Sequence, residues 1–171
     1  MDNSSIIILA IVIIVSVFGA YLLVYRKDIK GLKKEDDKDD QDKALQLQAY
    51  ERLVILTERI SLRNLIDRVP PAGSALGYQH LLVDTIKQEY DYNLSQQLYV
   101  SSQAWQAVSS LKEQNIFILH QLSAMLPAEA TGTDLAKKTL ELLESDPKTS
   151  LHTVVLEALR FDAGKLLKKQ H

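Results

Sequence analysis

The stretch FGAYLLVYRKDIKGLKKEDDKDDQDKALQL, residues 18–47, changes its solvent preference three times within thirty residues. It passes from apolar to basic, then to acidic, and finally to a pattern typical of a helix. A chain that leaves a lipid bilayer, follows its surface and then begins a domain in water needs these preferences in this order. The stretch therefore predicts both the organisation of the whole chain and its location.

Upstream of this stretch, the residues from Ile6 to Val24 read IIILAIVIIVSVFGAYLLV and carry no charge. A helix rises about 1.5 Å per residue, so this segment reaches about 28 Å, close to the roughly 30 Å hydrocarbon core of a bilayer. We therefore expect residues 1–25 to form a single N-terminal transmembrane anchor.

Two other readings of the apolar segment remain open, a cleaved signal peptide and a buried core helix. A signal peptide needs a positively charged leader, but residues 1–5 contain Asp2 and neither Lys nor Arg. A helix of a globular core would show a polar face, and residues 6–24 offer none. A retained anchor is the reading that the sequence favours.

The charges that follow the apolar segment predict its orientation. Basic residues come first, and the positive-inside rule then places the N-terminus outside and the remaining chain in the cytoplasm. Each basic side chain near anionic headgroups contributes on the order of 1 kcal/mol to surface binding. We expect a membrane-surface role for five residues: Arg26, Lys27, Lys30, Lys33 and Lys34.

An acidic run, Glu35 to Asp42, follows the basic residues and is interrupted only by Lys38 and Gln41. Anionic lipid repels it, so residues 26–42 are expected to be a juxtamembrane linker that holds the chain to the surface and then directs it away. An acidic metal or partner site is the alternative. Against it, the run lacks the glycine at the sharp turn and the closing glutamate of a calcium loop.

Residues 43–171 are expected to form one helical domain. Their 14 Lys and Arg balance 14 Asp and Glu, and the whole chain has a net charge of −2, which argues against nucleic-acid binding. The absence of cysteine excludes disulfides, thiolate catalysis and cysteine-based metal sites. No segment alternates with a two-residue period, so no strand is expected.

Helical periodicity instead predicts an all-α fold, in which a cytoplasmic bundle of four or five helices follows the transmembrane helix. The prolines and the Asp and Ser caps set the expected boundaries. The expected helices are Lys43–Val69, Tyr78–Tyr92, Leu94 or Ser95 to Leu126, Asp134–Ser145, and a last one that starts at Pro147 or Ser150.

A narrow basic ridge runs between the two apolar faces of the first expected helix, formed by Arg52, Arg59 and Arg63. It has two readings: a stripe that is merely solvated, or a cationic contact for an acidic partner or for phosphate. If the second holds, the ridge could also bind an anionic lipid surface.

The search for catalytic residues finds few candidates. Glu51 and Glu58 lie seven residues apart on the first expected helix, but the Glu-x-x-His partner of di-iron bundles is missing, so they are read as ion-pair or rim residues. None of the four histidines lies three or four residues from another. No cofactor, metal ligand or catalytic residue is expected. The alternative is an enzyme or metal site assembled across helices from Glu51, Glu58, Arg59 and either His80 or His120.

The segment EYDYNLSQQLYVSSQAWQAVSSLKEQ (Glu89–Gln114), together with LQAYERLVILTERI (Leu47–Ile60), resembles a family of small uncharacterised membrane-anchored proteins from Bacteroidota. The resemblance covers the helical part and the single N-terminal span. It implies a bacterial inner membrane. It brings no assigned activity and no catalytic residue that could be carried over to this chain.

The sequence thus predicts a membrane-tethered helical protein-interaction or scaffold module without catalytic activity of its own. Its expected partners are the lipid bilayer and either another protein or a second copy, and nucleic acid is not among them. The two alternatives are a membrane-associated enzyme or metal binder with a site between helices, and a binder of anionic lipid surfaces.

Overall fold

The computed structural model describes residues 40–145 and 151–168. The predicted span, the five basic residues and most of the predicted linker lie outside this part of the chain. In the described part, no helix is both long and apolar enough to cross a bilayer. Backbone contacts divide the chain into two units, residues 1–44 and 45–171.

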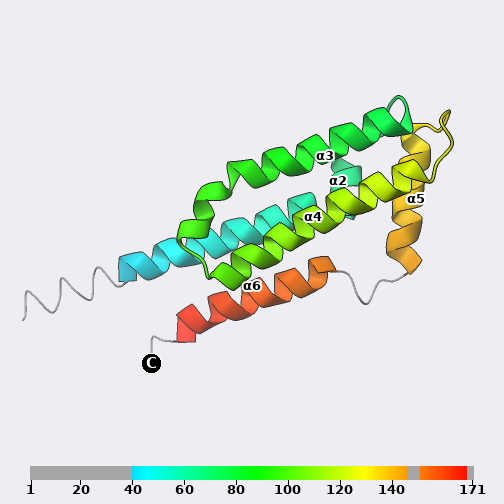
Figure 1. Ribbon diagram of the computed structural model, residues 1–171. Helices are drawn as coiled ribbons and strands as arrows, with labels where there is room; N and C mark the ends of the chain where they lie inside the picture. The colour runs from blue at the N-terminus through cyan, green and yellow to red at the C-terminus, as the bar shows by residue number, and fades with distance from the viewer. Residues whose placement is uncertain (1–39, 146–150, 169–171) are drawn as a thin grey trace, which may run out of the picture. The chain divides into compact units, whose positions relative to one another are not determined.

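All regular elements in the described residues are helical, which confirms the all-α class (Figure 1). The one β-type contact there is an isolated antiparallel bridge between Ser74 and Thr131. The helices are one that includes residues 40–60, α2 (Leu62–Arg68), α3 (Ala75–Tyr92), the 3-10 helix η1 (Leu94–Leu98), α4 (Ser102–Ala124), α5 (Gly132–Ser145) and α6 (Leu151–Lys168).

Helix α4 is central to the packing. It lies alongside α3 and also contacts α5 and α6, while α5 crosses the ends of α3 and α4 and touches α2 (Figure 1). Of the two apolar faces predicted for the first helix, the one that contains Leu53, Leu56 and Ile60 is buried, and these three side chains have no exposed surface. Their burial with leucines of the other helices forms one core, because each helix contributes an apolar stripe.

The prediction of one helix over Lys43–Val69 is wrong, because the chain turns at Ser61. That residue has an extended backbone (φ −60°, ψ 134°) and is the N-cap of α2. The interaction that fixes the break comes from far along the chain: the buried Asn115 of α4 donates from Nδ2 to the carbonyl of Ile60 at 2.8 Å. Six α-helices are therefore described instead of four or five.

The expected helix from Leu94 or Ser95 to Leu126 begins later, at Ser102. Ser101 is its N-cap, and its Oγ accepts a hydrogen bond from the Ala104 amide at 3.1 Å. The N-terminal end of a helix has unpaired amides, and a serine hydroxyl satisfies one of them. The preceding residues form the 3-10 helix η1, which has no buried residue.

A polar cluster joins α6 to the start of α4 and to helix 40–60. Ser101 Oγ donates to Asp162 Oδ2 at 2.9 Å, and the Ser101 amide donates to the hydroxyl of Tyr50 at 3.1 Å. Lys165 donates to the other carboxylate oxygen at 2.9 Å. This bond from Lys165 is the main reason that the pKa of Asp162 lies below its usual value, although partial burial opposes it.

Candidate functional site

A groove of about 630 Å³ runs between helix 40–60 and α3. It combines charged side chains with exposed apolar ones. Helix 40–60 supplies one wall and the C-terminal half of α3 supplies the other. The groove is lined by Gln48, Glu51, Arg52, Ile55, Arg59, Thr85, Gln88, Glu89, Tyr92 and Asn93.

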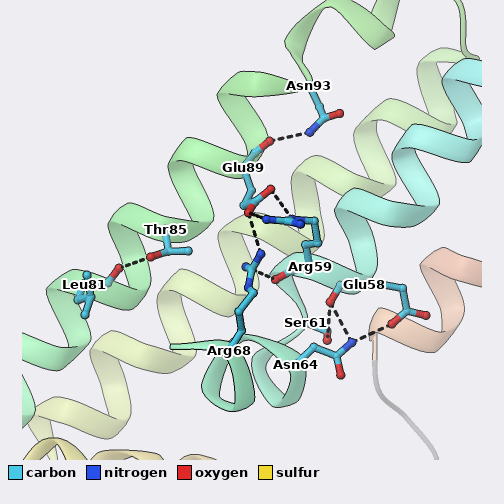
Figure 2. A network of polar contacts seen from close by, with 9 residues as sticks. All are labelled: Glu58, Arg59, Ser61, Asn64, Arg68, Leu81, Thr85, Glu89 and Asn93. Carbon is cyan, nitrogen blue, oxygen red and sulfur yellow. Dashed lines mark hydrogen bonds and ion pairs between the residues drawn. The ribbon is translucent and has the colours of Figure 1, made fainter. Parts of the chain in front are cut away.

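Glu89 of α3 stands at the centre of an ion-pair network at one end of this groove (Figure 2). Arg59 of helix 40–60 donates two hydrogen bonds to it, from Nε to Oε2 at 2.8 Å and from Nη2 to Oε1 at 2.6 Å. Arg68 of α2 adds a third, from Nη1 to Oε1 at 2.9 Å. A paired guanidinium–carboxylate contact of this kind is among the stronger and more directional hydrogen bonds in proteins.

The network keeps Glu89 ionised. Partial burial of its side chain, 15% exposed, would by itself raise the pKa, but the hydrogen bonds and charges of Arg59 and Arg68 together lower it below the ordinary value. The same bond to Glu89 is the main reason that the pKa of Arg59 is raised. Both Glu89 and Arg59 therefore carry full charge at neutral pH.

The arginines and their neighbours also satisfy the carbonyls left unpaired where helix 40–60 ends (Figure 2). Arg68 Nη2 donates to the carbonyl of Arg59 at 3.1 Å. The carbonyl of Glu58 accepts from Ser61 Oγ at 2.9 Å and from Asn64 Nδ2 at 3.0 Å. Glu89 is thus bonded to both sides of the helix break, which ties helix 40–60 and α2 to α3.

The open part of the groove carries side chains without partners. The side chains of Glu51 and Arg52 make no hydrogen bond or ion pair within the described residues. The groove is also lined by Ile55 of helix 40–60, half exposed, and by Tyr92 at the end of α3, 77% exposed. Charges of both signs beside an exposed aliphatic and an aromatic side chain suit a polypeptide segment better than a bare anion, because an anion would be repelled by Glu51.

The structure divides the predicted basic ridge. Arg52 and Arg59 line the same groove, and the charge of Arg59 is offset by Glu89. Arg63 lies beyond the break, on α2, where Nη2 is 3.8 Å from Glu144 Oε1 and both side chains are largely exposed. Two of the three ridge residues therefore meet at one surface, and the third lies elsewhere because the helix is not continuous.

The structure brings together only part of the alternative enzyme site, because Glu51 and Arg59 line the same groove and the other residues lie elsewhere. Glu51 lies in the groove, whereas Glu58 Oε2 is 3.2 Å from Nε2 of His152 in a second cavity of about 440 Å³. His80 is exposed, and His120 Nδ1 lies 3.1 Å from Gln79 Nε2. Across residues 40–145 and 151–168, no group of three or more acidic or histidine side chains is arranged to hold a metal ion.

The sequence did not point to Glu89 or to Arg68. They lie 30 and 9 residues from Arg59, whereas helical spacing relates only residues three or four apart. In the sequence, the charges around each of them are typical of a solvent-exposed helix face. The His152–Glu58 pair was missed for the same reason, since 94 residues separate its members.

Replacing Glu89 by glutamine should lower the free energy of unfolding at pH 7 by about 1–2 kcal/mol, because the part-exposed charged hydrogen bonds to two arginines are weakened. Since the folded-state pKa is lowered, this contribution is complete above the unfolded value of 4.5 and is lost as the pH falls through the folded value. The difference between the wild type and Glu89→Gln, measured by urea unfolding at several pH values, should therefore shrink below pH 4.5.

Glu144→Gln is the matched control, because its contact with Arg63 is long and largely exposed. We expect a change of only a few tenths of a kcal/mol from it. An equal loss in both variants, or a difference for Glu89→Gln that grows on acidification, would contradict the assignment.

Comparison with known proteins adds one match. The sequence model of a family described as "Family of unknown function (DUF7935)" matches residues 2–166. Neither the curated proteins nor the solved structures contain a match.

Proposed function

The chain belongs to the family of unknown function that matches residues 2–166, so its role has to be inferred from its own residues, and we propose that it is a membrane-tethered helical protein-interaction module. A single span over residues 6–24 holds the chain in the cell membrane. The N-terminus lies outside and the helical domain lies in the cytoplasm. The resemblance to bacterial membrane-anchored proteins favours an inner membrane as the setting.

One observation is the main support for the tether: the 19 uncharged residues 6–24 are followed within ten residues by Arg26, Lys27, Lys30, Lys33 and Lys34. The apolar length matches the bilayer core. The basic cluster on one side only favours retention of that side in the cytoplasm and adds contacts with anionic headgroups. The acidic residues that follow favour a domain held away from the lipid surface.

The groove between helix 40–60 and α3 is the proposed contact site for a protein partner. The Arg59–Glu89 contact joins its two walls, so the walls do not have to be ordered when a partner binds, and this lowers the entropic cost of binding. Ile55 and Tyr92 offer apolar contact, and the unpaired charges of Glu51 and Arg52 can select the register of the bound segment.

Tethering makes such a modest groove useful. Two proteins confined to the same membrane meet at a far higher effective concentration than free proteins do, so weak contacts are sufficient. A groove of this size would give only a weak complex between two proteins free in solution.

Site-specific photocrosslinking in membranes of the producing cells tests the groove. A photoreactive residue at Ile55, 50% exposed in the groove, should give a discrete crosslinked band. The matched position is Val154 of α6, which is 55% exposed and lies outside the groove. We expect no such band from it, and we expect Arg52→Glu to reduce the band at Ile55. The same bands at both positions, or none at Ile55, would contradict the groove as the contact site.

A further inference from the structure

The exposed face of α4 differs from those of the other helices in its charge. Of ten exposed positions on α4, only Glu113 is charged, whereas five of the eight exposed positions on α5 are charged. The exposed positions of α4 are Ser102, Gln103, Gln106, Ser110, Glu113, Gln114, Phe117, His120, Gln121 and Ala124. Those of α5 are Thr133, Asp134, Lys137, Lys138, Glu141, Leu142, Glu144 and Ser145.

The single charge on this face of α4 is offset. Lys112 Nζ lies 2.7 Å from Glu113 Oε1, and the same ammonium lies 4.4 Å from the centre of the Tyr90 ring. Near the middle of the face stands Phe117, 61% exposed. Soluble surfaces normally mix charges of both signs, while the centres of protein interfaces are depleted of charge and enriched in aromatic residues.

The exposed positions on this face coincide with those of a second α4 helix that runs in the opposite direction. Eight of them lie within one stripe of the helix, because they are three or four residues apart except for the adjacent pair Glu113 and Gln114, and their spacing is symmetric about the point between these two residues. An antiparallel copy would therefore place Gln106 opposite Gln121 and the small Ser110 opposite the large Phe117. Glutamine amides both donate and accept hydrogen bonds, so like side chains can pair across such a contact.

We propose that this face of α4 binds the same face of a second copy of the chain, with the two α4 helices antiparallel about a two-fold axis. A two-fold contact brings identical residues close together near the axis, so a face with net charge would repel itself. This face avoids that repulsion. An anionic lipid surface fits it less well, because lysine and arginine attract such lipid and none is exposed on the stripe.

The size of the contact links this proposal to the proposed function, on whose tether it rests. Helix α4 has 23 residues and is therefore about 34 Å long, so the proposed contact consists of a single pair of helices, at the small end of interfaces whose stable members bury roughly 1,200 Å² or more. The dimer is expected to be weak between free molecules. Confinement of both copies to one membrane raises their effective concentration and makes the contact effective.

The chain has no cysteine, so one introduced thiol reports the dimer without interference. Glu113→Cys puts a thiol beside the proposed axis, and Glu141→Cys puts one on an exposed position of α5. Oxidation of the full-length variants in membranes should crosslink Glu113→Cys into a dimer at least about tenfold more efficiently than Glu141→Cys, as expected for a contact worth about 1.4 kcal/mol or more.

A second substitution tests the face itself. Phe117→Arg, added to Glu113→Cys, should reduce the dimer yield about tenfold, because two like charges then face the same small interface. Phe161→Arg on α6 is the control, since Phe161 is 67% exposed and neither phenylalanine belongs to the core. We expect it to leave the yield unchanged. Unchanged thermal unfolding, followed by circular dichroism, would show that both arginine variants are folded.

Equal crosslinking at Glu113→Cys and Glu141→Cys would overturn the proposal, and so would a dimer that survives Phe117→Arg. Crosslinks from residue 113 to a different protein, without a dimer, would overturn it too. The membrane fraction of each variant is measured in the same samples. A membrane-bound chain that fails to dimerise therefore refutes the α4 contact alone, and a chain absent from the membrane refutes the tether.

Discussion

Replacing Gly132 by alanine is expected to lower the free energy of unfolding by about 1–3 kcal/mol, the usual cost of forcing an extra carbon into a filled site. A Cβ on Gly132 would lie 2.8 Å from the carbonyl oxygen of Ala72 and 3.0 Å from Cβ of Tyr78. The Gly132 amide donates to the carbonyl of Gly73 at 2.9 Å, so the two segments cannot separate without loss of this bond. The start of α5 must pass this close to the loop before α3.

Gly164→Ala on α6 is the matched control, because a Cβ there would meet no atom within 4 Å. Alanine restricts the unfolded chain more than glycine does, so this variant should be more stable by about 0.5–1 kcal/mol. Urea unfolding of the full-length chain in mild detergent can be followed through Trp105, the only tryptophan, which packs against Tyr90. Shifts of the same sign in both variants would contradict the close approach at Gly132.

Placing two arginines in the middle of the apolar segment, Ile14→Arg with Val15→Arg, is expected to remove the chain from the membrane fraction. Each arginine at the centre of a span costs about 2.5–3.5 kcal/mol on insertion scales, so the two together oppose the insertion of residues 6–24 by about 5–7 kcal/mol. Alkaline carbonate extraction followed by immunoblotting measures the effect. We expect the wild type to remain in the pellet and the double variant to be extracted.

The control for this experiment adds the same charges to the exposed faces of the helical domain, as Ile55→Arg with Val154→Arg. Both side chains are about half exposed, so the domain should fold and the chain should stay in the pellet. Retention of the Ile14→Arg, Val15→Arg variant in the pellet would mean that residues 6–24 are not what holds the chain to the membrane.

Local sequence patterns predicted the helical class and the buried face of helix 40–60, because helical periodicity depends only on residues that are three or four apart. The sequence also contains a signal for the start of α4, because Ser101 directly precedes its apolar periodicity and is its N-cap. The break at Ser61 could not be found in this way. It depends on Asn115, 55 residues away, whose amide replaces the hydrogen bond that the next turn of helix would have made.

The candidate site was predictable only in part. The arginine ridge drew attention to Arg52 and Arg59, and both line the groove. The two walls of the groove are held together by the contact of Arg59 with Glu89, and this contact exists only because α3 returns alongside helix 40–60. The small number of charges on α4 could be seen in the sequence, but its meaning depends on which side of α4 is exposed, and only the packing of α3, α5 and α6 determines that.

Protection of a C-terminal epitope from protease tests the central claim most directly, namely that residues 6–24 hold the helical domain on the cytoplasmic side of the membrane. We expect protease added to intact cells or spheroplasts to leave the epitope in place, and we expect the epitope to be lost once the membrane is broken. Digestion of the epitope in intact spheroplasts would contradict the account, because the helical domain would then lie on the outer side.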